Sequence, residues 1–158
     1  MNRGSSLFLR AVVVLIGLGA LAFLLWQPHV EGRNAHATVF EIYFKDPFLA
    51  YVYVGSIPFF VGLVHAFKVL GYTGRRNEFS ASAVRSLRTI KFCAIALVGF
   101  VALGEVFIFM SPDDDRAGAV MMGVAIAFVA VLVATATAIL ERTLRHAVDM
   151  KSENDLTV

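Results

Sequence analysis

Residues 117–140 read AGAVMMGVAIAFVAVLVATATAIL and contain no charged side chain. An α-helix needs about 20 mainly apolar residues to cross about 30 Å of hydrocarbon, and this stretch is long enough. Three more apolar stretches of similar length precede it, at residues 7–26, 48–70 and 92–110. The sequence therefore predicts an all-α, polytopic membrane protein in which residues 1–158 form a single four-helix transmembrane domain.

The composition agrees with this fold class. Apolar residues make up 58% of the chain and charged residues only 16%. The charges lie mainly between the apolar stretches, which together occupy more than half of the sequence. This leaves no segment within the 158 residues for a separate soluble domain. A lone cysteine, Cys93, excludes an intramolecular disulfide and is interpreted as a small core residue.

The first apolar stretch has an alternative interpretation as a secretory signal. Arg3 and Arg10 give it a basic start, and Ala35-His36-Ala37 resembles a cleavage site. However, its apolar run continues to Trp26, which is longer than the 7–15 residues of a signal core, and the cleavage pattern lies well beyond it. We therefore expect a retained helix.

Basic residues predict the orientation of the four helices. If both termini and the middle loop face the cytoplasm, 11 of the 14 Lys and Arg residues lie on that side. Only Arg33, Lys45 and Arg116 lie on the other. Such a bias follows the positive-inside rule. We expect an antiparallel bundle in the bacterial inner membrane, with the N-terminus and the C-terminus both cytoplasmic.

The third helix is predicted to begin before its apolar stretch. Ser80 can cap a helix that starts at Ala81, and no proline or glycine follows until Gly99. Spacing by three places a basic set on one helix face and an apolar set on another. The residues proposed to bind lipid or a partner here are Arg85, Leu87, Arg88, Ile90 and Lys91. The simplest interpretation is attraction of the basic residues to anionic lipids of the inner leaflet, and protein binding is the alternative. No helix-turn-helix pattern supports nucleic-acid binding.

The fourth helix is also predicted to outrun its apolar stretch. Residues 141–150 keep a helical pattern, with Leu144 and Val148 four residues apart. We therefore expect the third and fourth helices to extend together into the cytoplasm.

The loops on the other side offer two weak metal interpretations. His29, Glu31, His36 and Glu41 match no compact ligand spacing, so a polar loop is the simpler reading. The run Asp113–Asp115 lacks the spaced ligands and glycine of a calcium loop and fits the start of the fourth helix better. We predict no metal and no cofactor.

Two ionisable residues stand out inside the predicted spans because they lie away from the basic cytoplasmic side or can carry a proton: Glu105 in the third span and His65 in the second. A carboxylate within the bilayer is costly, so Glu105 should face other helices, pair or take up a proton. The two residues are expected at different depths, so we expect no direct Glu–His pair. A structural hydrogen bond is the simpler role for each, and an ion or proton path is the alternative.

Two short segments carry a resemblance to a known family. Phe79-Ser80 followed by Leu87-Arg88-Thr89-Ile90, and the terminal Glu153-Asn154-Asp155-Leu156-Thr157-Val158, resemble small four-helix bacterial membrane proteins grouped as domain of unknown function 2975. The resemblance implies no established activity. It implies that a small helix-turn-helix regulator is a plausible operon partner, and it adds Asp155 and Leu156 to the residues to test.

Three functions remain open from the sequence. The first is a non-enzymatic signalling or partner-binding protein that acts through its basic cytoplasmic extension and tail. The second is a small oligomeric channel or transporter that uses Glu105. An integral membrane enzyme is the weakest, because the sequence has no nucleophile elbow, zinc motif or phosphate loop.

Overall fold

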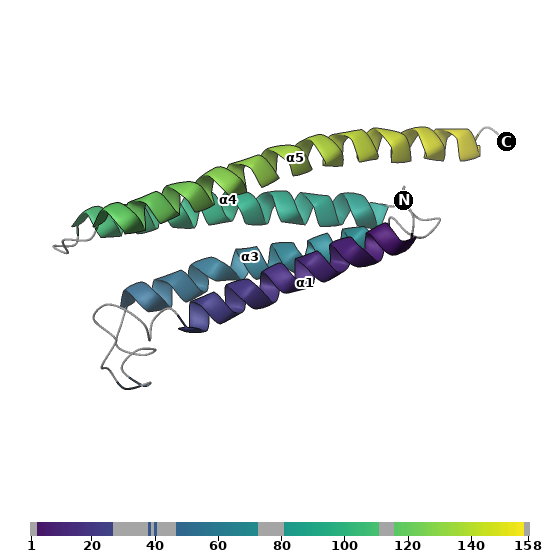
Figure 1. Cartoon of the computed structure of the whole chain (residues 1–158). Helices are drawn as coiled ribbons and strands as arrows, with labels where there is room; N and C mark the ends of the chain where they lie inside the picture. The colour runs from purple at the N-terminus through teal and green to yellow at the C-terminus, as the bar shows by residue number, and fades with distance from the viewer. Residues whose placement is uncertain are drawn as a thin grey trace.

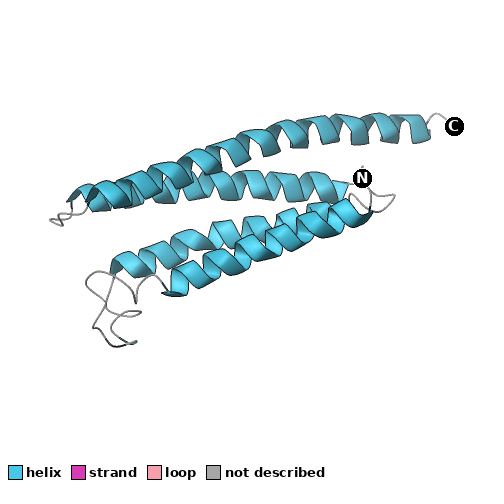
Figure 2. Cartoon of the chain, viewed as in Figure 1, coloured by secondary structure: helices cyan, strands magenta, loops and turns pink. Residues whose placement is uncertain are grey.

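The computed structural model describes residues 3–26, 38, 40, 47–72, 81–110 and 116–156. Within them the chain forms four long helices (Figure 1): α1 Arg3–Trp26, α3 Pro47–Tyr72, α4 Ala81–Met110 and α5 Arg116–Leu156. None of the described residues forms a strand (Figure 2). All four helices are long and apolar enough to cross a membrane, which confirms the predicted fold class. The weak metal candidates, His29, Glu31, His36 and Glu41 and the run Asp113–Asp115, lie outside the described residues.

Two of the helices are longer than a bilayer requires. α4 begins at Ala81, as the capping pattern predicted, and has 30 residues. α5 has 41 residues, which at 1.5 Å per residue gives a length of about 60 Å. That is about twice the hydrocarbon thickness, so part of α5 lies outside the hydrocarbon core of a bilayer.

The helices pack in chain order, α1 on α3, α3 on α4 and α4 on α5. Two hydrogen bonds join α1 to α3 near their ends: Ser6 Oγ donates to the Leu70 carbonyl oxygen (2.8 Å), and the Tyr53 hydroxyl donates to the Leu24 carbonyl oxygen (2.9 Å). Each bond joins the beginning of one helix to the end of the other. Figure 1 accordingly shows α1 beginning and α5 ending at the same end of the molecule, which we call the terminal end.

The α3–α4 contact combines aromatic residues with glycines. The Tyr51 hydroxyl donates to the Phe100 carbonyl oxygen (2.5 Å), and the Tyr51 ring centroid lies 5.7 Å from that of Phe107. Gly55 and Gly62 face Phe100 and Cys93, where an added β-carbon would come within 3.4 and 3.6 Å. Small residues at such contacts let helices in membranes approach closely.

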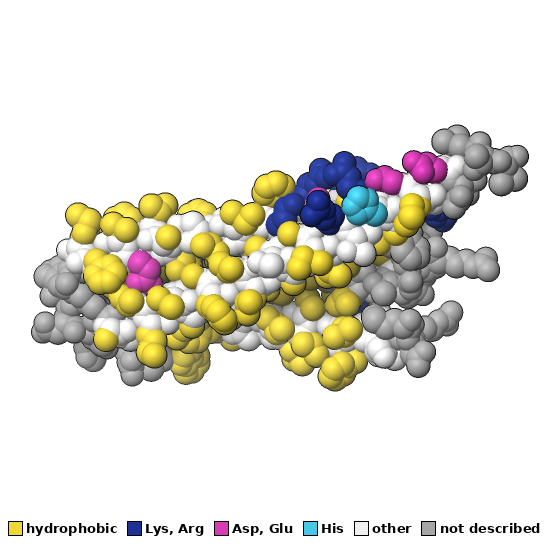
Figure 3. All heavy atoms as spheres, turned by 90° about the horizontal axis from the view of Figure 1, so that it is seen from above, with side chains coloured by type: hydrophobic (Ala, Val, Ile, Leu, Met, Phe, Trp, Pro, Cys, Tyr) yellow, Lys and Arg dark blue, Asp and Glu magenta, His cyan; other side chains and the backbone are white. Residues whose placement is uncertain are grey.

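Little of the apolar surface is buried between the helices. The buried apolar residues are Leu49, Ala83, Leu87, Ala94 and Ala130, and most large apolar side chains are exposed, as the yellow surface in Figure 3 shows. The accessible surface is 11270 Å², whereas a compact soluble protein of 17.2 kDa has about 7,800 Å². This open packing leaves the outer faces of the helices to the surrounding lipid.

Candidate functional site

The best-defined polar contact lies between α4 and α5 and centres on Glu141. This residue follows the apolar run of α5 directly, and its side chain is only 8% exposed. Arg88 Nε donates to Glu141 Oε1 (2.8 Å), and Lys91 Nζ donates to Glu141 Oε2 (2.5 Å). Each carboxylate oxygen therefore has its own cationic donor.

Helix geometry explains why these three residues meet. Arg88 and Lys91 are three residues apart, so they lie on the same face of α4. α5 packs against that face and brings Glu141 between them. Hydrogen bonds between charged partners are about twice as strong as neutral ones, and a buried carboxylate without partners is costly. The triad therefore favours one register of α5 along α4.

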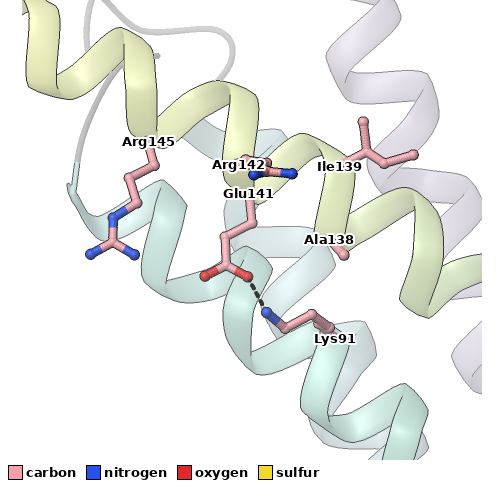
Figure 4. A pocket seen from close by; sticks show the side chains of 6 residues that line it. All are labelled: Lys91, Ala138, Ile139, Glu141, Arg142 and Arg145. Carbon is pink, nitrogen blue, oxygen red and sulfur yellow. Dashed lines mark hydrogen bonds and ion pairs between the residues drawn. The ribbon is translucent and has the colours of Figure 1, made fainter.

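An open groove of about 370 Å³ lies beside this triad (Figure 4). Its lining consists of Lys91, Ala138, Ile139, Glu141, Arg142 and Arg145. Figure 4 shows the dashed contact from Lys91 to Glu141, with Arg142 and Arg145 on the same helix as the carboxylate. Both arginines are exposed. Basic side chains gather in one patch of the face seen in Figure 3, toward the end of α5.

The predicted partner-binding or lipid-binding residues of α4 separate into three groups. Arg85 is exposed and accessible. Arg88 and Lys91 are engaged with Glu141, with side chains 45% and 24% exposed. Leu87 is 6% exposed, so it packs inside the protein and does not present a surface in this conformation; Ile90 is half-buried. Lipid or partner binding at these residues stays a prediction.

The C-terminal candidates lie at the end of the longest helix. α5 continues to Leu156 and so includes Asp155. The side chains of these two residues lie outside the described part of the chain. The path of α5 places Asp155 and Leu156 beyond the groove, at the end of the part that follows the apolar run.

Glu105 contacts α5 at the opposite end of the helix pair. A β-carbon at Gly123 would overlap Glu105 Oε1, so the glycine makes room for the carboxyl group. Glu105 Oε2 is buried and has no hydrogen-bond partner among the described residues. The carboxyl group thus faces a neighbouring helix, one of the arrangements expected from the cost of exposing it to lipid.

His65 lies on α3, away from Glu105. Its Nδ1 atom is buried and has no hydrogen-bond partner in the described part of the chain. Tyr51 of α3 lies against Gly104 and so marks the depth of Glu105. His65 is 14 residues further along α3, about 21 Å along the helix axis. The structure therefore does not bring the two residues together.

Glu141 is the site residue that the sequence did not single out. Its position directly after the fourth apolar run was visible, as was its spacing of four from Arg145. That spacing is compatible with an ion pair within one helix. The structure instead pairs Glu141 with α4, and no metal-binding cluster of three or more His, Cys, Asp or Glu residues occurs among the described residues.

Comparison with known proteins places the chain in a family. A family model matches residues 11–158. The chain belongs to that family, which is described as a protein of unknown function (DUF2975). It is also 40% identical over 160 aligned positions to YoaS of Bacillus subtilis (strain 168), described as an uncharacterized membrane protein, with both chains covered completely. No solved structure matched the chain. The DUF2975 resemblance is confirmed, and the protein is a small membrane protein.

Proposed function

We propose that this DUF2975 protein is a non-enzymatic, partner-binding membrane protein that acts through a helical stem. The stem is defined as residues 81–91 of α4 and 141–156 of α5. One observation carries the proposal: α5 stays helical for sixteen residues past Leu140 and is ion-paired to α4 where it leaves its apolar run. A membrane anchor alone needs neither the extra length nor a fixed register.

The charge bias supports a cytoplasmic position for the stem in the bacterial inner membrane. The stem carries exposed basic residues on both helices, among them Arg85, Arg142, Arg145 and Lys151. Under the positive-inside rule such residues remain in the cytoplasm. α1 begins and α5 ends at the terminal end of the molecule, so both termini would be cytoplasmic (Figure 1).

The proposed partners follow from this surface. Anionic lipids of the inner leaflet would contact the basic residues nearest the bilayer, with about 1 kcal/mol per Lys or Arg. A small cytoplasmic regulator would contact the projecting part of the stem, an idea supported by the family resemblance. A second copy of this chain is a further proposed partner, because the exposed apolar helix faces could pack against each other in a homo-oligomer. We propose neither an enzymatic activity nor direct nucleic-acid binding.

Partner binding is tested with a small helix-turn-helix regulator as the probe, chosen from the genes that flank this one, because the family resemblance suggests such a neighbour. We expect the regulator to copurify with the wild-type membrane protein. Charge reversal at the outer stem, Arg85→Glu with Lys151→Glu, should reduce copurification at least tenfold, because both side chains are exposed and neither belongs to the Glu141 triad. Arg88 is a poor choice because its replacement would also break that triad.

Two controls accompany this experiment. Glu105→Gln changes a residue between α4 and α5 far from the stem and should leave copurification unchanged. A fluorescent reporter that is silent outside the cytoplasm, fused to the C-terminus, should be bright. Undiminished copurification by the charge-reversed variant would contradict the partner surface, and a dark, well-expressed fusion would contradict the orientation.

A small oligomeric channel or transporter is the second candidate. The observation in its favour is the buried Glu105 Oε2 atom without a hydrogen-bond partner among the described residues. If the protein is a channel, liposomes that contain it should show ion flux. Glu105→Gln should abolish this flux, and the Arg85→Glu, Lys151→Glu variant should retain it. Absence of ion flux from the wild-type protein would count against a channel function.

A further inference from the structure

We propose that the groove between α4 and α5 is a discrete binding site for the phosphate-bearing headgroup of one anionic phospholipid. This proposal rests on the proposed contact with inner-leaflet lipids. It assigns that contact to one site, where the earlier proposal required only a general electrostatic attraction. The lining residues that carry the argument are Lys91, Ala138, Ile139, Arg142 and Arg145.

The charge of the groove favours an anion. Together with Arg88, which reaches Glu141 from α4, the site holds four cations, Arg88, Lys91, Arg142 and Arg145, against the single carboxylate of Glu141. Both Glu141 oxygens are already engaged by Arg88 and Lys91. Four positive charges and one negative charge leave a net charge of +3. The guanidinium group of arginine binds phosphate through two parallel hydrogen bonds, and the two exposed arginines face this groove.

The depth of these cations matches the phosphate layer of a bilayer. Headgroups add about 5–7.5 Å to each side of the hydrocarbon. Measured along α5 from Leu140, the last residue of the apolar run, Arg142 lies about 3 Å and Arg145 about 7.5 Å beyond it. On α4, Arg88 lies about 6 Å before Phe92, the first residue of its apolar run. The cations therefore lie within the headgroup layer.

The acidic residues of α5 lie farther out. Asp149 is nine residues past Leu140, about 13.5 Å along the helix, and Glu153 is four residues beyond it. Both positions are outside the phosphate layer, where they would not repel a lipid phosphate at close range. Glu141 is the one carboxylate at phosphate depth on either described helix, and it is neutralised by its two partners.

The apolar part of the groove favours a lipid over a free anion. Ala138 and Ile139 line its hydrocarbon side, and Ile139 is 62% exposed. A phospholipid can pack its first acyl methylenes against these residues while its phosphate meets the arginines. The volume of about 370 Å³ lies at the small end of ligand sites, which fits a headgroup and not a whole lipid.

The test uses the full-length protein in a neutral detergent, titrated with phosphatidylglycerol, phosphatidylcholine or inorganic phosphate and followed by native mass spectrometry. We expect phosphatidylglycerol to bind well above phosphatidylcholine, and inorganic phosphate not to displace it at equal concentration. Arg142→Gln with Arg145→Gln should weaken phosphatidylglycerol binding about 30-fold, from the usual contribution of two cations at a membrane surface. The matched control, Arg85→Gln with Lys151→Gln, removes two cations outside the groove and should change binding less than about threefold.

Four results would overturn the site: equal binding of both lipids, equal weakening by the control pair, no weakening by the groove pair, or displacement of lipid by inorganic phosphate. Photoactivatable phosphatidylglycerol, which should label residues 138–145 of the wild-type protein, keeps the test decisive if the groove variant fails to fold. The groove variant should still copurify with the regulator. Equal binding of both lipids by the wild-type protein, with copurification intact, would therefore refute the lipid site and leave the proposed partner binding standing.

Discussion

Two carboxylates lie in the same contact between α4 and α5, yet their surroundings are opposite. Glu141 has a cationic donor for each oxygen, whereas Glu105 Oε2 is buried without a hydrogen-bond partner among the described residues. Glu105 faces Gly123, which lies 18 residues before Glu141 on α5, or about 27 Å along the helix. That separation is close to the hydrocarbon thickness of a bilayer. Glu141 thus lies at one end of the membrane-spanning part of this helix pair, and Glu105 lies inside that part, toward the other end.

The difference between them indicates different roles. A carboxylate with two charged donors contributes to the register of its helices, and losing a donor or the carboxylate leaves a charge without its partner. A carboxyl group with an unused oxygen in a bilayer costs free energy, and in membrane proteins such residues mark functional positions by default. We infer that Glu141 mainly stabilises the stem, whereas Glu105 is the residue on which the channel alternative depends.

Charge reversal at Glu141 should have the largest effect on stability. Glu141→Lys places a third cation against Arg88 and Lys91 in a buried position. We expect the free energy of unfolding to fall by at least about 3 kcal/mol, as when a buried ion pair loses one partner. The measurement is denaturant unfolding of the purified protein in mixed micelles, with the expression level as a second readout.

Thr143→Lys is the matched control for this change. It adds the same side chain two residues away, at an exposed position of the same helix. We expect the free energy of unfolding to change by no more than about 0.5 kcal/mol, which is typical of surface substitutions. Similar losses from both variants would show that the triad does not fix the contact between α4 and α5.

The same neutral substitution at the two carboxylates should give different, intermediate results. Glu141→Gln loses the charge that holds Arg88 and Lys91, and we expect the free energy of unfolding to fall by about 1–3 kcal/mol. Glu105→Gln removes no hydrogen bond to Oε2. We therefore expect the free energy of unfolding to fall by less than about 0.5 kcal/mol or to rise slightly. Parallel unfolding curves of the two variants measure the difference; equal losses would mean that Glu105 has a stabilising partner of its own.

The sequence predicted the helices well because the signals for them are local. Apolar runs of sufficient length specify the spans, and the Ser80 position with its uninterrupted continuation specified the start of α4 at Ala81. The depth difference between Glu105 and His65 also followed from counting residues along each helix. These inferences need only the rise per residue and the position of each apolar run.

The sequence could not predict the contacts between helices. Arg88 and Lys91 were identified as one basic face, but the partner that meets this face depends on the register of α5, which no local pattern specifies. Leu87 was placed on an apolar face of α4, but whether α5 or a partner covers that face is a matter of packing. Glu141 was overlooked for the same reason, since its spacing from Arg145 offered a local pair that competed with the long-range one.

The smallest expected effect tests the placement of Glu105 directly. Gly123→Ala adds a β-carbon where Glu105 Oε1 lies, so the carboxyl group must rotate away. Because a flexible side chain can yield, and because alanine favours a helix by about 0.5–1 kcal/mol over glycine, the net change in the free energy of unfolding should stay within about 1 kcal/mol. Gly99→Ala, with nothing within 4 Å of its added β-carbon, should show only the gain in helix stability.

In a Glu105→Ala background, Gly123→Ala should give the same gain in the free energy of unfolding as Gly99→Ala. The resulting coupling between positions 105 and 123, about 0.5–1 kcal/mol in a double-mutant cycle, measures the contact itself. Strict additivity would place the Glu105 carboxyl group elsewhere and would remove the structural reason for assigning it a role of its own.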